Sequence, residues 1–77
     1  PVARVEVELA RRTDVFGPLA QVFSTFERTI DGETVRGINC IQMRKSGAHE
    51  AGRWRLISVA WTDERDDLPL PSRFLPR

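Results

Sequence analysis

The side chains that could carry chemistry in this chain of 77 residues are few and well separated. Ser24 has no base predicted near it, so we interpret it as a small residue tolerated beneath a covering element. His49 lies in a Gly-containing turn, which gives a general base no shelter, and a solvated histidine is the favoured interpretation. Cys40 is the only cysteine, so no internal disulfide can form, and its apolar neighbours favour a small buried side chain. We predict no catalytic residue, and one histidine with one cysteine cannot build a closed zinc site.

Length and charge limit the class of protein. The size allows one small domain, and the twelve basic and eleven acidic residues are interspersed and give a net charge of +1. This pattern argues against nucleic-acid and anionic-membrane partners, and no apolar run is long enough for a membrane span. The sequence shows no signal peptide and no need for a metal or cofactor, and we expect a reducing, cytoplasmic setting.

Hydrophobic periodicity predicts four strands, at residues 2–11, 19–30, 35–45 and 53–62. The first alternates strictly between β-branched or leucine residues and charged ones, with Glu6 and Glu8 expected in weak cross-strand ion pairs. A helix competes for 19–30, although its aromatic and β-branched content favours a strand. Turn residues predict a hairpin loop or bulge at 12–18 and turns at 31–33 and 46–52. Residues 65–77 read as a Pro-rich extended tail, either loosely held or packing Leu70, Phe74 and Leu75 onto a neighbouring surface.

Centring each turn assigns a register and therefore two faces to the sheet. The mainly apolar face is expected to hold Val5, Val7, Leu9, Val22, Ser24, Phe26, Asn39, Ile41, Met43, Ile57, Val59 and Trp61. The mixed face is expected to hold Arg4, Glu6, Glu8, Phe23, Thr25, Ile38, Cys40, Gln42, Trp54, Leu56, Ser58 and Ala60. Because the last strands are apolar on both faces, a bare sheet cannot bury them. We therefore expect helices outside these residues over the first face and a partner subunit on the second.

Two motifs resemble a known family. Gly52-Arg53-Trp54 and Trp61-Thr62-Asp63-Glu64 resemble the last strand of the nuclear transport factor 2-like, or SnoaL-like, superfamily, and residues 16–27 resemble an earlier strand. The resemblance implies an α+β cone in which helices pack onto a curved, cystatin-like antiparallel sheet. Residues 1–64 would then supply four antiparallel strands of a single domain that lacks its N-terminal helices here.

The resemblance also implies a pocket and a dimer. The expected ligand pocket comprises Val22, Ser24, Phe26, Asn39, Ile41, Met43, Ile57, Val59 and Trp61. The expected dimer face comprises Phe23, Ile38, Cys40, Trp54 and Leu56. In ketosteroid isomerase, a more distant likeness, the position of Asn39 supplies an oxyanion donor, so Asn39 could orient a carbonyl ligand. The alternative is that Asn39 satisfies a backbone group.

Two functions follow as hypotheses. The first is a SnoaL-like homodimer of uncharacterised function that binds a small apolar ligand between sheet and helices. The alternative is an isomerase, dehydratase or polyketide-cyclase-like enzyme whose acid or base comes from the missing N-terminal half. A third interpretation is an assembly module with no pocket, held together through the sheet.

Overall fold

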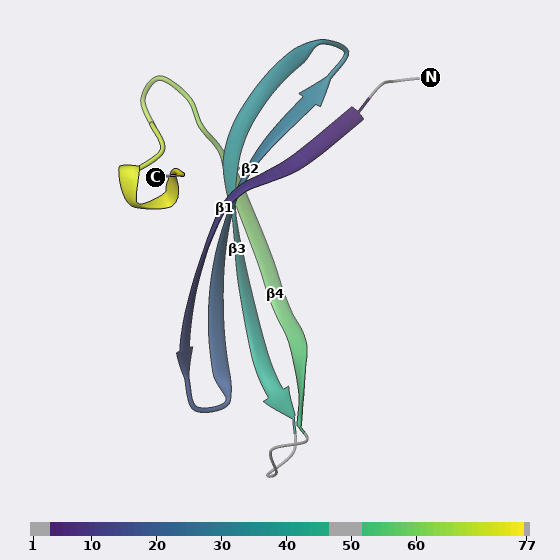
Figure 1. Cartoon of the computed structure of the whole chain (residues 1–77), viewed down its shortest axis with the longest axis vertical. Coiled ribbons are helices and arrows are strands. Elements are labelled where there is room, and N and C mark those ends of the chain that lie inside the picture. The colour runs from purple at the N-terminus through teal and green to yellow at the C-terminus, as the bar shows by residue number, and fades with distance from the viewer. Residues whose placement is uncertain (1–3, 47–51, 77) are drawn as a thin grey trace.

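The structure is a computed structural model that describes residues 4–46 and 52–76 (Figure 1). Four strands follow one another in the chain: β1 (Arg4–Phe16), β2 (Leu19–Ile30), β3 (Glu33–Ser46) and β4 (Arg53–Asp63). They form one antiparallel sheet in the order β1-β2-β3-β4, so that β1 and β4 are its edges. The sheet is strongly twisted, and its strands cross one another near their middles in Figure 1.

The expected α+β cone is wrong for the described part of the chain. Its residues contain no α-helix, and the single helical element is the short 3-10 turn η1 (Ser72–Phe74). The architecture is therefore an open, all-β antiparallel sheet and not a cystatin-like cone. The cone was inferred from the motif likeness and from the need to cover two apolar faces. The structure meets that need only in part, because a C-terminal arm covers some of one face.

The strands agree with the predicted segments except at the first connection. Residues 19–30 form β2 as expected, which excludes the competing helix. β1 runs through to Phe16, so the loop or bulge expected over 12–18 shrinks to a two-residue turn at Gly17-Pro18. The Asp31-Gly32 turn has positive φ at both positions, 50° and 82°, which is the type I′ geometry that Asp-Gly favours between antiparallel strands. His49, most of the turn over 46–52 and the start of the first predicted strand lie outside the described residues.

The predicted register is wrong, although the faces of β2 and β3 survive. Centring the turns set Ser24 opposite Ile41 and Asn39 opposite Val59. The structure instead pairs Ser24 with Asn39 and Ile41 with Val59, a shift of two positions that keeps each side chain on its face. We call the side of the sheet that carries Ser24 and Phe26 face one, and the side that carries Phe23 face two.

Two β-bulges change the faces of the edge strands. In β1 the register shifts between Glu8 and Ala10, so Glu8 lies opposite Phe26 on face one and Val7 lies on face two. In β4 the extra residue is Ile57, and beyond it Leu56 lies opposite Met43 on face one. Single-residue insertions reverse the alternation of every later side chain, and periodicity within one strand does not reveal them.

The C-terminal arm, residues 65–76, folds back over face two. Glu64, directly before the arm, accepts hydrogen bonds from Arg36 at 2.9 Å and from the backbone N–H of Leu70 at 3.1 Å. At its far end Phe74 is buried against Phe23, with ring centroids 4.9 Å apart. The buried residues are few: Phe26 and Ser24 on face one, Thr25 and Phe74 on face two, and Gly37 beneath Phe26.

Candidate ligand-binding face

A row of four side chains crosses face one from edge to edge. Arg11 lies opposite Ser24, Ser24 opposite Asn39, and Asn39 opposite Trp61. Directly opposed residues in an antiparallel sheet project to the same side, so the four strands deliver one polar-to-aromatic line. The amide of Asn39 makes no side-chain hydrogen bond to another described residue, and it is therefore free to bind a ligand.

The carboxylate of Glu8 lies at the polar end of this row, where it contacts Arg11 and Ser24. The hydroxyl of Ser24 donates to a Glu8 carboxylate oxygen, and Arg11 donates to the same oxygen through two nitrogens at 3.1 and 3.2 Å. The Ser24 hydrogen bond, followed by that of Arg11, lowers the pKa of Glu8 below its ordinary value. Glu8 is therefore an ionised acceptor near neutral pH and cannot serve as a proton donor there. The sequence analysis expected no base beside Ser24, and the bulge in β1 is the reason that one is present.

Phe26 and Arg28 bound the row on its other side. The ring of Phe26 lies over Gly37, where an added Cβ would come within 2.6 Å of the ring. Arg28 sits 5.4 Å from the centre of that ring and binds both oxygens of Asp63 at 3.3 Å. The contacts among Phe26, Gly37, Arg28 and Asp63 connect β2, β3 and β4, and they place an apolar ring beside the row.

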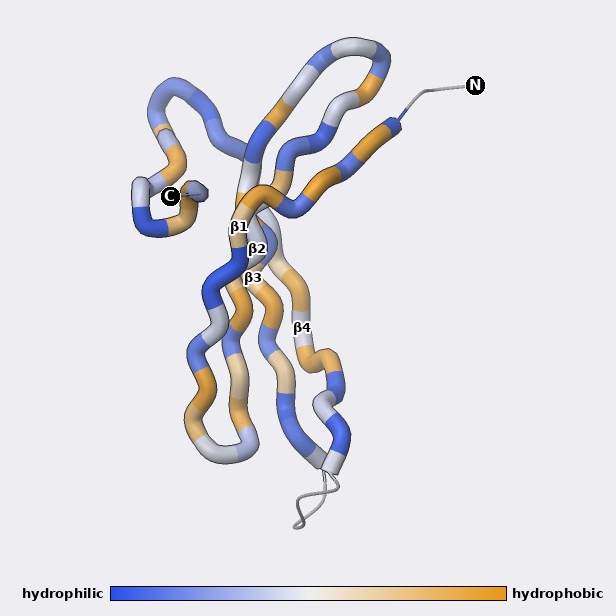
Figure 2. The backbone as a smooth tube through the Cα atoms, viewed as in Figure 1, coloured by the Kyte–Doolittle hydropathy of each residue, from blue (hydrophilic) through white to orange (hydrophobic). Residues whose placement is uncertain are grey.

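The β4 end of face one is open. Val22, Ile41 and Val59 form a second, wholly apolar row beside the polar one. Trp61 is 66% exposed and Val59 43% exposed, although both stand on the same face as the buried Phe26. Figure 2 shows hydrophobic residues along the middle of β4, where no described element covers them. An exposed surface of this kind on a small sheet is typical of a binding face.

The structure brings nearly all of the predicted pocket residues to one face, but it does not enclose them. Val22, Ser24, Phe26, Asn39, Ile41, Met43, Val59 and Trp61 share face one. Ile57, at the bulge, lines a hollow of about 440 Å³ together with Phe16, Leu19 and Met43, and Met43 thus belongs both to this hollow and to face one. Face one is therefore an open surface in the described residues and not the pocket between sheet and helices that was expected.

The predicted dimer face does not form one surface. The ring of Phe23 packs against the ring of Phe74 of the same chain, which covers it. Cys40 stands beside Phe23 on face two, where its sulfur accepts a hydrogen bond from Gln21 at 3.2 Å. Trp54 and Leu56 lie beyond the β4 bulge, opposite Lys45 and Met43, and so belong to face one. The bulge separates residues that a regular strand would have kept together.

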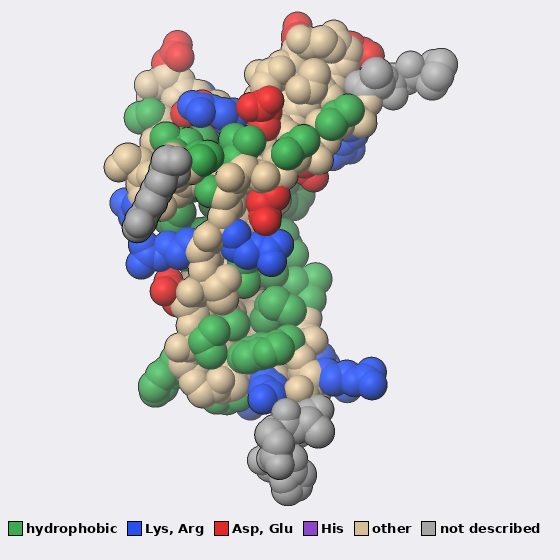
Figure 3. All heavy atoms as spheres, in the orientation of Figure 1, with side chains coloured by type: hydrophobic (Ala, Val, Ile, Leu, Met, Phe, Trp, Pro, Cys, Tyr) green, Lys and Arg blue, Asp and Glu red, His purple; other side chains and the backbone are tan. Residues whose placement is uncertain are grey.

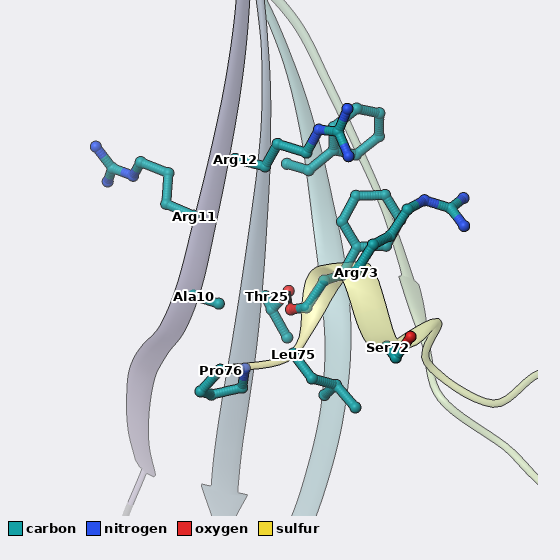
Figure 4. Close-up of a pocket in the computed structure, with 10 residues that line it drawn as sticks. Ala10, Arg11, Arg12, Thr25, Ser72, Arg73, Leu75 and Pro76 are labelled. Atoms are coloured by element: carbon teal, nitrogen blue, oxygen red, sulfur yellow. Dashed lines mark hydrogen bonds between the residues drawn. The ribbon is translucent and has the colours of Figure 1, made fainter.

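A second hollow lies between the C-terminal arm and the β1–β2 hairpin on face two. It has a volume of about 510 Å³, and Figure 4 shows Arg12 and Arg73 on the same side of it while Arg11 points the other way. The guanidinium of Arg73 lies 4.7 Å from the centre of the Phe74 ring. Thr25 donates to the carbonyl of Phe74 at its base. Sequence reasoning missed this groove, since the path of the arm is not encoded in any periodic pattern.

Metal ligation finds no support in the described residues, because they contain no group of three or more His, Cys, Asp or Glu side chains placed to share an ion. None of the helical segments in the described ranges has the length and apolar character of a membrane span. Comparisons with family models, with curated proteins and with solved structures find no match to this chain. The function must therefore be argued from the geometry of face one.

Proposed function

We propose that the sheet is a binding module whose face one takes a small, flat, apolar molecule carrying a hydrogen-bond acceptor. The observation that carries this proposal is the free amide of Asn39 beside the 66% exposed side chain of Trp61. An apolar body would lie on Trp61 and Val59 and remove apolar surface from water. Its carbonyl or carboxylate oxygen would accept from Asn39, whose amide donates at any pH.

The polar end of the row supports the same orientation. Arg11 and Glu8 form an ion pair at the far end of the row, so this end adds no net charge. The Ser24 hydroxyl already donates to Glu8, which leaves the amide of Asn39 as the donor for a ligand acceptor. The single cysteine supports a reducing, cytoplasmic setting as part of the proposal.

The enzyme alternative has less support. An isomerase, dehydratase or cyclase needs a base within hydrogen-bond reach of the substrate proton. The carboxylate nearest the polar row is Glu8, which already accepts from Ser24 and Arg11 and whose pKa is lowered by them. A carboxylate stabilised in this way is a weaker base than a free one, so we place binding first.

The test uses Trp61 as its reporter. In a Trp54→Phe background, Trp61 fluorescence is titrated with naphthalene, 2-acetylnaphthalene and 2-naphthoate, which share one ring system and differ in the acceptor. We expect saturable quenching, tightest for the ligands with an acceptor, and an Asn39→Leu variant that binds all three alike. An unchanged Trp61 signal with every probe, on protein that is folded by circular dichroism, would refute the proposal.

A further inference from the structure

Strand β4 is an edge that is built unlike the other edge of the sheet. Residues 53–62 of β4 are all exposed, and five of them are the large apolar side chains Trp54, Leu56, Ile57, Val59 and Trp61. The opposite edge strand, β1, also exposes large apolar side chains, but charged residues interrupt it from Arg4 to Asp14 and discourage pairing with another strand. In β4, by contrast, residues 56–62 carry no charge. An uncharged, apolar stretch of an edge strand is a template for strand addition.

The backbone of β4 shows which groups are available. The N–H of Glu64 donates to the carbonyl of Arg36 at 2.7 Å, which makes 36 and 64 a hydrogen-bonded pair. Such pairs alternate along an antiparallel ladder, so Ser58, Ala60 and Thr62 direct their N–H and C=O groups toward β3. Val59 and Trp61 therefore direct theirs outward, away from the sheet.

The distribution of charged side chains along β4 indicates which kind of strand would pair with it. Arg44, Lys45, Arg53 and Arg55 gather where β3 ends and β4 begins, and none of them forms an ion pair with a described residue. Figure 3 shows Lys and Arg side chains at this end of the molecule. The other end of β4 leads into Asp63, Glu64, Asp66 and Asp67, of which Asp63, Glu64 and Asp67 pair with Arg28, Arg36 and Arg65 of the same chain. Asp66 forms no ion pair with a described residue. An identical strand that runs antiparallel brings each unpaired basic end toward this acidic segment of the other copy, once on each side of the axis.

We infer that a second copy of this chain adds its own β4 antiparallel to the first, around a two-fold axis at Ala60, to make one continuous eight-stranded sheet. This register pairs Val59 of each copy with Trp61 of the other and joins their outward N–H and C=O groups. Both side chains of each pair stand on face one, as an aromatic and a β-branched neighbour. The interface is a strand edge and not the sheet face that the sequence analysis expected.

Neighbouring registers fit less well. An axis at Ser58 places the centre of pairing beside the Ile57 bulge, where the strand is bent and its ladder is broken. An axis at Trp61 sets Val59 opposite Asp63, an apolar side chain against a carboxylate. At the axis, Ala60 of one copy faces Ala60 of the other as a non-hydrogen-bonded pair, and the Cα atoms of such a pair approach to about 4.5 Å. This short distance requires a small side chain, and alanine meets the requirement.

The experiment is disulfide trapping combined with sedimentation. Cys40 lies opposite Ala60 in the same chain and would capture a new cysteine there, so the test variant is Cys40→Ala with Ala60→Cys. The matched control is Cys40→Ala with Ser58→Cys, on the same strand and the same face, where Ser58 would meet Thr62 of the second copy. We expect the Ala60 variant to form covalent dimers several-fold faster than the control. Equal trapping, or trapping of the Ser58 variant alone, would overturn the register.

A second variant tests the edge itself. Val59→Pro removes an N–H that points outward and leaves the bonds to β3 intact, so the fold should survive, as judged by circular dichroism. We expect the parent chain to sediment as a concentration-dependent dimer and Val59→Pro to sediment as a monomer. Val15→Lys, a change at an exposed valine on the other edge strand β1, should leave the dimer in place. A parent chain that stays monomeric at millimolar concentration, or a Val59→Pro variant that stays dimeric, refutes the inference.

Discussion

Phe74 holds the C-terminal arm on face two, and replacing it with alanine tests whether the arm stabilises the sheet. The side chain is 9% exposed and packs against Phe23, with the ring centroids 4.9 Å apart. Thr25 donates to its carbonyl from below, and Thr25 is itself only 1% exposed. The arm therefore reaches the sheet mainly through this one side chain and one hydrogen bond.

The expected loss can be worked from these contacts. Burying a phenylalanine side chain contributes about 1.5–3 kcal/mol, and a well-placed aromatic pair adds about 0.5–1.5 kcal/mol. Because little of the ring remains in water, nearly all of this is lost in Phe74→Ala, or roughly 2–4 kcal/mol. A core of this size rarely provides more than about 3–5 kcal/mol in total. The substitution should therefore remove half or more of the free energy of unfolding.

Urea unfolding at fixed protein concentration, followed by far-ultraviolet circular dichroism, measures this loss. Phe16→Ala is the matched control, since it makes the same chemical change at a side chain that is 81% exposed. We expect the control to change the free energy of unfolding by less than about 0.5 kcal/mol. Similar losses in the two variants would show that Phe74 contributes no more than a solvent-exposed ring, and the packing argument for the arm would fail.

Three further outcomes are expected. Gly37→Ala should lower stability by about 1–3 kcal/mol, because its Cβ would collide with the backbone carbonyl oxygen of Thr62 and come within 2.6 Å of the Phe26 ring; a neutral effect in thermal unfolding would contradict that close approach. Thr25→Val keeps the shape of a buried residue and removes its hydrogen bond to the Phe74 carbonyl, so it should cost about 1 kcal/mol in urea unfolding, and unchanged stability would count against the bond. The N–H of Leu70, then the Arg36 side chain, lowers the pKa of Glu64 below its ordinary value of 4.5. Its contribution is thus present above that value and lost as pH falls through the folded pKa, so Glu64→Gln should weaken the fall in melting temperature on acidification, and parallel pH profiles would refute this.

The strands were predictable to different degrees. Strand β2 and the Asp31-Gly32 turn follow from local chemistry, since β-branched and aromatic content and an Asp-Gly pair specify them within a few residues. The bulge at Ile57 was not predictable, because an extra residue in β4 is defined only by its partner in β3. Its consequence is large, since it moves Trp54 and Leu56 onto face one.

The sequence was sufficient to predict which residues of β2, β3 and β4 share the candidate site, but not which side chains make contact with them. Alternation alone placed Ser24, Asn39 and Trp61 on one face, and the structure keeps them there. The carboxylate of Glu8 joins them only because the β1 bulge reverses its direction, and the charged alternation of β1 predicted the opposite face. The path of the arm that brings Phe74 to Phe23 spans the sheet and has no local signature.

By itself the sequence determined four strands, the face shared by β2 and β3, and an excess of apolar side chains for a bare sheet to bury. These are properties of alternation and turn chemistry, which act between near neighbours in the chain. Only the tertiary structure decided that the described residues contain no α-helix, that the arm packs on face two and that β4 is an edge of the sheet with exposed apolar side chains. Those outcomes depend on which strands pair and in which register, and such pairing involves segments that are far apart in the sequence.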